Sequence, residues 1–142
     1  MISSLFAHKV ANATAPDDAA RRRALLESVS VDPDAPVDPK TMVPDADYYA
    51  MCERAIRDDP DGSSLTVRVG RSMCCNDYGA FGLAFKTAPD LRASYARAER
   101  YGLVLTSVTT YQVVRDDGRM FMTLNRDGPR DLGMRLSNEQ SL

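Results

Sequence analysis

The sequence contains few of the residues that metal and disulfide sites need. It has one histidine, His8, and three cysteines, Cys52, Cys74 and Cys75, none of them in a C-x-x-C spacing. A structural zinc site takes about four ligands, and Cα atoms of adjacent residues such as Cys74 and Cys75 lie only about 3.8 Å apart, too close for an unstrained disulfide. The sequence favours a reducing compartment, and we expect no metal and no cofactor.

Positive charge is not in excess either. Lysine and arginine number 18 against 20 acidic residues, which gives a net charge of -2. The nearest approach to a basic run, Arg21 to Arg23, follows Asp17 and Asp18 and is typical of a solvated helix face. Because binding to a phosphate backbone depends on clustered lysine and arginine, we do not expect this chain to read DNA itself.

Long apolar runs are also missing. None approaches the roughly 20 residues needed to cross a bilayer, and residues 1–9 lack a basic leader ahead of an apolar block, so no signal peptide is predicted. We expect a cytoplasmic protein with no membrane partner. At 142 residues and 44% apolar composition, the chain is long enough for one domain with a real core.

The first 28 residues predict helix, broken once. Ser3 or Ser4 can cap a short first segment. The sequence Thr14-Ala15-Pro16-Asp17 then has capping-box spacing with an early proline, which predicts a second helix ending near Ser28.

Residues 30–45 mix proline with aspartate and predict a tightly draped loop with no regular element. A third helix is expected from Asp45 or Asp47 to about Arg57. Its apolar residues are spaced for one buried face. They are Tyr48, Met51, Cys52 and Ile56.

Two further helices are expected in the middle of the chain. Residues 76–87 are apolar almost throughout and predict a buried helix, in which Gly79 and Gly82 could let another backbone approach closely. Pro89 starts the next helix, and Gly102 terminates it. Its residues at helical spacing are Leu91, Tyr95, Ala98 and Tyr101.

After Gly102 the pattern changes from helix to strand. Valine, threonine and tyrosine dominate up to Val114, and the Asp117-Gly118 turn signal predicts an antiparallel hairpin with strands at about 104–115 and 119–125. A last helix is expected from Leu132. The fold class predicted is α+β, mostly helical, with five or six helices packed around this one hairpin.

Several short motifs, weak singly, occur here in a recognisable order. They are Gly70, Tyr78-Gly79-Ala80-Phe81-Gly82, Pro89-Asp90-Leu91, Arg100-Tyr101 and Leu136-Ser137-Asn138-Glu139. Their order and spacing, from Leu5 to Leu142, resemble the arabinose-binding-type N-terminal domain of AraC-family bacterial transcription regulators. The resemblance favours a helix from Ser64 to about Met73, where the alternation of Leu65, Val67 and Val69 would otherwise fit a strand.

That resemblance implies a sensor and dimerisation domain without catalysis. It implies a small-molecule effector, either an amino acid or a sugar-like metabolite, and a homodimer that meets DNA only through a C-terminal helix-turn-helix module. The chain stops at Leu142, so we expect residues 1–142 to be a single, truncated sensor domain with no DNA-binding domain of its own.

Six residues are candidates for the effector site. Tyr78, Phe81 and Phe85 could line an apolar cavity, while Arg97, Arg100 or Tyr101 could grip a carboxylate or hydroxyl. The alternative is that the aromatic residues are simply core and that the arginines are surface or interface residues.

Two other functions stay open at this point. One is a purely structural dimerisation module without a ligand. The other is a small thiol-dependent enzyme centred on Cys74 or Cys75, because Arg71 is near in sequence and a cation can lower a thiol pKa.

Overall fold

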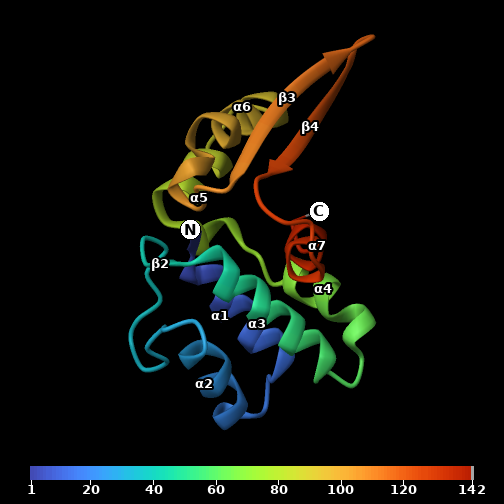
Figure 1. Ribbon diagram of the computed structural model, residues 1–142. Helices are drawn as coiled ribbons and strands as arrows, with labels where there is room; N and C mark the ends of the chain where they lie inside the picture. The colour runs from blue at the N-terminus through green and yellow to red at the C-terminus, as the bar shows by residue number, and fades with distance from the viewer. Residues whose placement is uncertain (142) are drawn as a thin grey trace. The chain divides into compact units, whose positions relative to one another are not determined.

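The computed structural model describes residues 1–141, and the chain divides into two compact units (Figure 1). The helical unit comprises Met1–Met73 together with the segment from Pro129 onward, and the hairpin unit comprises Cys74–Gly128. The helical unit is thus built from two segments that are remote in sequence, with the hairpin unit inserted between them.

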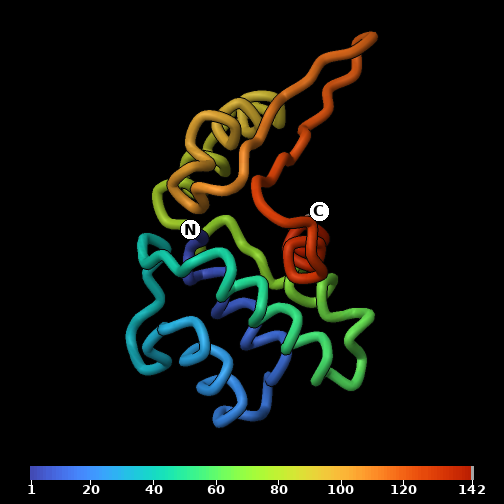
Figure 2. Tube along the Cα trace, in the orientation of Figure 1, coloured from blue at the N-terminus to red at the C-terminus, as the bar shows by residue number. Residues whose placement is uncertain are grey.

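Five α-helices and one short sheet form the helical unit over the described residues. The helices are α1 (Ser4–Thr14), α2 (Ala19–Glu27), α3 (Asp45–Arg57), α4 (Gly62–Arg71) and α7 (Leu132–Glu139). The sheet pairs β1 (Ile2–Ser3) antiparallel with β2 (Met42–Val43). Helices α1 and α3 lie side by side, and α7 returns from the far end of the chain to pack against α3 and α4 (Figure 1 and Figure 2).

The hydrophobic core lies in the helical unit. Among residues 1–141, every buried apolar side chain except those of Ala98 and Leu105 belongs to it. Helix α3 contributes Tyr48, Met51 and Cys52, each almost fully buried. The predicted face of α3 is confirmed at these three positions, whereas Ile56 is only half-buried.

Helix α7 approaches the backbone of α3 closely at Gly133, which has no side chain. A Cβ atom added at Gly133 would lie 2.4 Å from the carbonyl oxygen of Tyr49, so only glycine allows this approach. Nearby, the Tyr48 hydroxyl donates a 2.9 Å hydrogen bond to Oε1 of Gln140. Both groups are buried, and the bond joins residues 92 positions apart.

The helix starts are set by short polar caps. Ser3 accepts from the amide of Leu5 to cap α1, and Asp18 accepts from the amide of Arg21 to cap α2. The expected capping box at Thr14 is wrong, because the Thr14 hydroxyl donates to the Val10 carbonyl inside α1. Threonine makes such bonds to the carbonyl four residues back in helices.

The Pro-rich loop (residues 28–41) is bound to the start of α1. The sequence predicts a loop over residues 30–45 without a regular element, but the structure has the short strand β2 in that range. The Ser3 hydroxyl donates to the Pro39 carbonyl at 2.7 Å, and the Ser4 amide donates to Thr41 at 2.7 Å. Met42 and Val43 then pair with β1. A two-residue strand leaves no alternation to detect.

The hairpin unit contains two α-helices, two 3-10 turns and a hairpin. Its elements are η1 (Cys75–Tyr78), α5 (Gly79–Lys86), α6 (Leu91–Tyr101), η2 (Gly102–Val104), β3 (Thr109–Asp116) and β4 (Arg119–Arg126). Asp117 and Gly118 have φ of 44° and 74°, the left-handed pair typical of a two-residue hairpin turn. The predicted hairpin is present, but β3 begins at Thr109 and not at about residue 104, because η2 ends at Val104 and residues 105–108 connect it to the strand.

The expectation of a buried helix over residues 76–87 is wrong in two respects. The segment starts as the 3-10 turn η1, and within α5 only Gly82 is buried, while Leu83 is 63% exposed. Gly82 does permit a close approach, but its neighbour is the carbonyl of Cys75 in the preceding turn and not another helix. The apolar residues of this segment do not form a single stripe at helical spacing, so the sequence did not show which face of the helix would be buried.

Helix α6 buries only part of the set of residues that the sequence places at helical spacing. Ala98 is buried and Tyr95 half-buried, whereas Leu91 and Tyr101 are 59% and 40% exposed. Ser94 is also buried. Gly102 is itself buried, and a Cβ atom there would lie 2.6 Å from the Tyr111 ring of β3. The α+β, mostly helical class is confirmed, with seven α-helices and two two-stranded sheets in residues 1–141, more than the five or six helices and one hairpin expected.

We expect Gly133→Ala to lower the free energy of unfolding by about 1–3 kcal/mol, the range for overpacking a tight contact. Helix propensity alone acts in the opposite direction, since alanine is favoured over glycine by about 1 kcal/mol. Chemical denaturation should show the loss. Arg135→Ala on the exposed side of α7 is the control, and stabilisation by Gly133→Ala would contradict the close α3–α7 contact.

Candidate functional site

The three predicted aromatic residues form one row in the hairpin unit. The Tyr78 and Phe81 rings meet edge to face, with centroids 6.1 Å apart, and the Phe81 and Phe85 rings are stacked at 6.4 Å. All three side chains are half-buried. Burial, with a smaller effect from neighbouring groups, raises the pKa of Tyr78, so its hydroxyl stays neutral at physiological pH.

Arg97 is already engaged in holding α5 to α6. Its Nη1 donates to the Ala84 carbonyl and, at 3.2 Å, to the hydroxyl of Thr87. The Ser94 hydroxyl adds a 3.1 Å bond to the carbonyl of Phe85. A ligand carboxylate would have to compete with these carbonyl bonds for the guanidinium.

The last two predicted residues form a separate, exposed pair. The Arg100 guanidinium lies 5.3 Å from the centroid of the Tyr101 ring, a cation–π arrangement. The six candidates therefore form an aromatic row beside a structural arginine, together with a surface pair. Whether any of them contacts an effector stays a prediction.

A cleft that the sequence did not indicate lies in the helical unit. Its volume is about 380 Å³, within the range of about 300–1,000 Å³ typical of small-molecule pockets. Helices α1 and α2 and the Pro-rich loop line it. The lining residues are His8, Asn12, Ala19, Ala20, Arg22, Arg23, Leu26, Pro33 and Asp34.

The arginines of this cleft have defined partners. Arg23 Nη2 lies 2.6 Å and 2.9 Å from the two carboxylate oxygens of Asp34, which fixes the Pro-rich loop to α2. Arg22 donates to the carbonyls of Ala15 and Pro16 at 2.7 Å and 2.6 Å. Both cations therefore bridge chain segments as well as lining the cleft.

His8 and Asn12 are the lining residues that α1 contributes to the cleft. They lie four residues apart on α1, so they share one face of the helix. Burial lowers the pKa of His8 from its ordinary value of 6.5, which leaves the imidazole neutral at pH 7, with one nitrogen as donor and the other as acceptor. The four-residue spacing of His8 and Asn12 could be read from the sequence. That the Pro-rich loop would line the same cleft could not.

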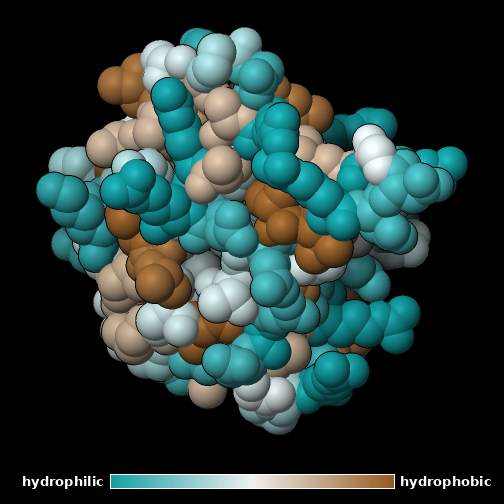
Figure 3. Space-filling view, turned by 90° about the horizontal axis from the view of Figure 1, so that it is seen from above, coloured by the Kyte–Doolittle hydropathy of each residue, from teal (hydrophilic) through white to brown (hydrophobic). Residues whose placement is uncertain are grey.

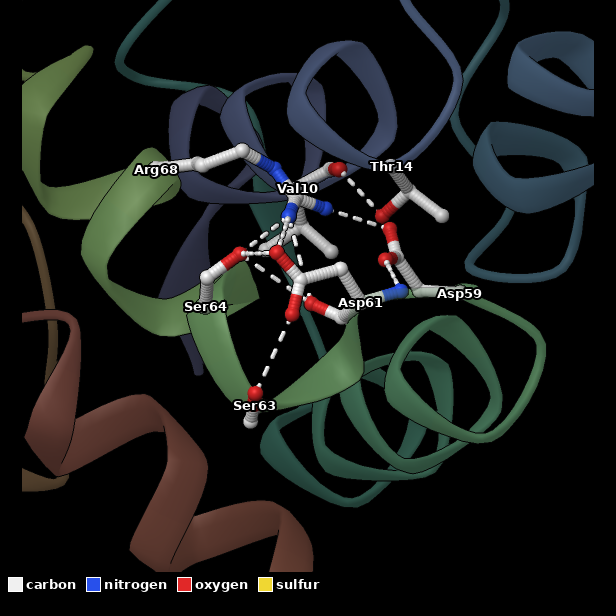
Figure 4. A network of polar contacts seen from close by, with 7 residues as sticks. All are labelled: Val10, Thr14, Asp59, Asp61, Ser63, Ser64 and Arg68. Atoms are coloured by element: carbon white, nitrogen blue, oxygen red, sulfur yellow. Dashed lines mark hydrogen bonds and ion pairs between the residues drawn. The ribbon is translucent and has the colours of Figure 1, made fainter.

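A dense polar network at the start of α4 is also in the helical unit (Figure 4). The Asp59 side chain is only 4% exposed and accepts from Arg68 at 2.5 Å. Ser63 and Ser64 donate to the Asp61 carboxylate. Because its hydrogen-bond partners all lie within the chain, the network anchors the turn between α3 and α4, and we assign it no ligand.

No catalytic arrangement is described around Cys74 and Cys75. Cys74 is exposed and Cys75 half-buried, and the Cys74 amide donates to the Asp77 carboxylate at 3.1 Å to cap η1. The histidine belongs to the other unit. Within residues 1–141, no group of three or more histidine, cysteine, aspartate or glutamate side chains could hold a metal ion, and no helix is long and apolar enough to span a bilayer.

Comparison with known proteins defines a class, that of effector-binding regulatory domains. The family model described as the arabinose-binding domain of AraC transcription regulator, N-terminal, matches residues 20–140. The chain belongs to this family, whose members are regulator ligand-binding domains and not typically enzymes. No curated protein and no solved structure matches the chain.

The hydrogen bonds to Asp61 should make stability depend on pH in the acid range. Ser64, Ser63 and Arg68 hold the pKa of the Asp61 carboxyl below its ordinary value of 3.8. A lowered folded-state pKa contributes stability that is present above the unfolded value and is lost as the pH falls through the folded value.

We therefore expect the stability of the wild type to decline more steeply than that of Asp61→Asn as the pH falls below about 4. Urea denaturation of both proteins across this range measures the difference. Asp17→Asn, an exposed change outside the network, should parallel the wild type. Equal slopes for the wild type and Asp61→Asn would contradict the assigned interaction.

Proposed function

We propose that this chain senses a small-molecule effector, forms a homodimer, and controls transcription through a DNA-binding module outside this sequence. The observation that carries the proposal is the family match over residues 20–140. The charge of the chain supports the proposal that a separate module binds DNA, because a net charge of -2 with dispersed arginines gives little attraction to phosphate.

The surface of the hairpin unit supports self-association. Large apolar side chains that are 48–64% exposed lie on α5, η2 and β4. They are Leu83, Leu103, Val104 and Phe121. Figure 3 shows patches of hydrophobic residues on a face that is otherwise mainly hydrophilic. Since β4 pairs with β3 alone among the described strands, its other edge also offers unpaired backbone groups.

We expect the wild type to be a dimer and Phe121→Asp to shift it towards monomer. Phe121 is 48% exposed opposite Val114 in the hairpin, so a carboxylate there would be desolvated on association. Sedimentation velocity over a concentration series measures the shift. Val37→Asp is the matched control, because Val37 is 49% exposed in the helical unit. A monomeric wild type would refute the dimer.

Effector sensing predicts a ligand-dependent rise in thermal stability. A compound that binds only the folded state stabilises it by RT ln(1 + [L]/Kd), about 2.7 kcal/mol at a hundredfold excess over Kd. We expect at least one compound in a panel of amino acids, neutral sugars and sugar acids to raise Tm, with a dose response. A dimer that responds to none of them would favour a purely structural module.

A further inference from the structure

We propose that two copies of this chain associate edge to edge through β4, in antiparallel orientation, so that their two hairpins form one continuous sheet. The inference rests on the homodimer of the proposed function, and it adds the strand and the register through which that dimer forms. The surface involved, the β4 edge, consists of the outward backbone groups of Arg119–Arg126 and the apolar side chains beside them.

The other edge of the hairpin is occupied within the chain. Helix α6 packs against β3, and the Val113 amide donates a 3.2 Å hydrogen bond to Oε1 of Glu99 on that helix. In contrast, β4 pairs with β3 alone among the strands of residues 1–141. An added strand can therefore pair with β4 more readily than with β3.

Alternate residues of β4 point their backbone groups towards the open edge. In an antiparallel pair, two residues that lie directly opposite either bond to each other or both point away. The Val113 amide points away from β4, because it bonds to Glu99. Met122 lies opposite Val113, so its own N–H and C=O point outward. Met120 and Leu124, two residues away on either side, do the same.

The same three residues carry apolar side chains on one face of the strand. Met122 is 38% exposed, and Met120 and Leu124 are half-buried. Phe121, on the opposite face, is 48% exposed. Solvent therefore reaches large apolar side chains on both faces of an open edge, and their burial favours association with a further strand.

A second copy of β4 complements this edge when the two strands are antiparallel and centred on Met122. Met120 of each copy then lies opposite Leu124 of the other, and the outward backbone groups of the two strands meet. The apolar side chains beside them form one continuous row. Because both copies use the same surface, the arrangement has the two-fold symmetry that is commonest among protein dimers.

Charge also favours a second copy in this register. Arg119 would lie opposite Asn125 of the second copy, and Arg126 opposite Gly118, beside the acidic turn residue Asp117. Like charges directly opposite one another are destabilising, and this register avoids them in β4. A shift by one residue would set Arg119 opposite Arg126 and would also misalign the outward backbone groups.

The first test compares two substitutions at Met122 that both remove the methionine side chain. Proline also removes the outward N–H, and edge strands tolerate it where that group does not serve the ladder. Threonine keeps the N–H and suits a strand. We expect Met122→Pro to raise the dimer dissociation constant about tenfold or more above that of Met122→Thr, because each copy loses one interchain hydrogen bond. Sedimentation velocity measures the difference, and matching circular dichroism and Tm would show that both hairpins are intact.

The second test locates the symmetry axis by disulfide formation and does not depend on proline. It uses a Cys74→Ser/Cys75→Ser background, because Cys74 is exposed. With Met122→Cys, the two introduced residues would face each other with Cα atoms about 5.5 Å apart, within the range of about 4.4–6.8 Å that a disulfide spans. Oxidation with copper phenanthroline should therefore produce a covalent dimer.

Asn125→Cys is the matched control for the disulfide, since Asn125 is exposed on the same strand. The two copies of this residue would lie about six positions apart along the paired strands, or about 20 Å. We therefore expect no covalent dimer from Asn125→Cys under the same conditions.

The contrary outcomes separate this inference from the proposed dimer. A folded Met122→Pro that dimerises as tightly as Met122→Thr would overturn the β4 ladder, and so would a dimeric Met122→Cys that does not crosslink. In either case the dimer itself would stand. If Met122→Pro loses its hairpin, the disulfide test decides. A wild type that stays monomeric at every concentration would overturn both the ladder and the dimer on which it rests.

Discussion

The helical unit depends on the contact between α3 and α7. Gly133 lets the backbones of the two helices approach, and the buried Tyr48–Gln140 hydrogen bond joins them across 92 positions of sequence. One such bond contributes only about 0.5–1.5 kcal/mol net, but burying either group without its partner would cost more. The contact fixes the position of the helix that follows the hairpin unit, and it closes the core around Met51 and Cys52.

The two units divide the chemical properties of the chain between them. The helical unit contains nearly all of the buried apolar residues described and has an open cleft lined by both polar and apolar side chains. The hairpin unit has little core of its own and exposes Leu83, Leu103 and Phe121. A domain that self-associates needs an exposed apolar surface, and the proposed function assigns that surface to the hairpin unit.

Local signals in the sequence predicted most of the helices and the hairpin turn. Caps and turns depend on neighbouring residues, so a helix start near Pro89 and the Asp117-Gly118 turn could be recognised directly, although the cap itself is Asp90. Burial was harder to predict, because it depends on what packs against an element. The apolar segment around Phe81 therefore suggested a core helix, although most of the core lies elsewhere. For the same reason the aromatic row suggested a site, while the His8–Asn12 face did not.

The sequence by itself determined the α+β class, the family and the scarcity of metal-binding residues, since these depend on composition, periodicity and the order of short motifs. Only the tertiary structure decided that α7 closes the core of the first helices and that a Pro-rich loop brings Asp34 to the same cleft as His8. Both depend on contacts between residues far apart in the chain. Such contacts have no fixed spacing, so no local pattern records them.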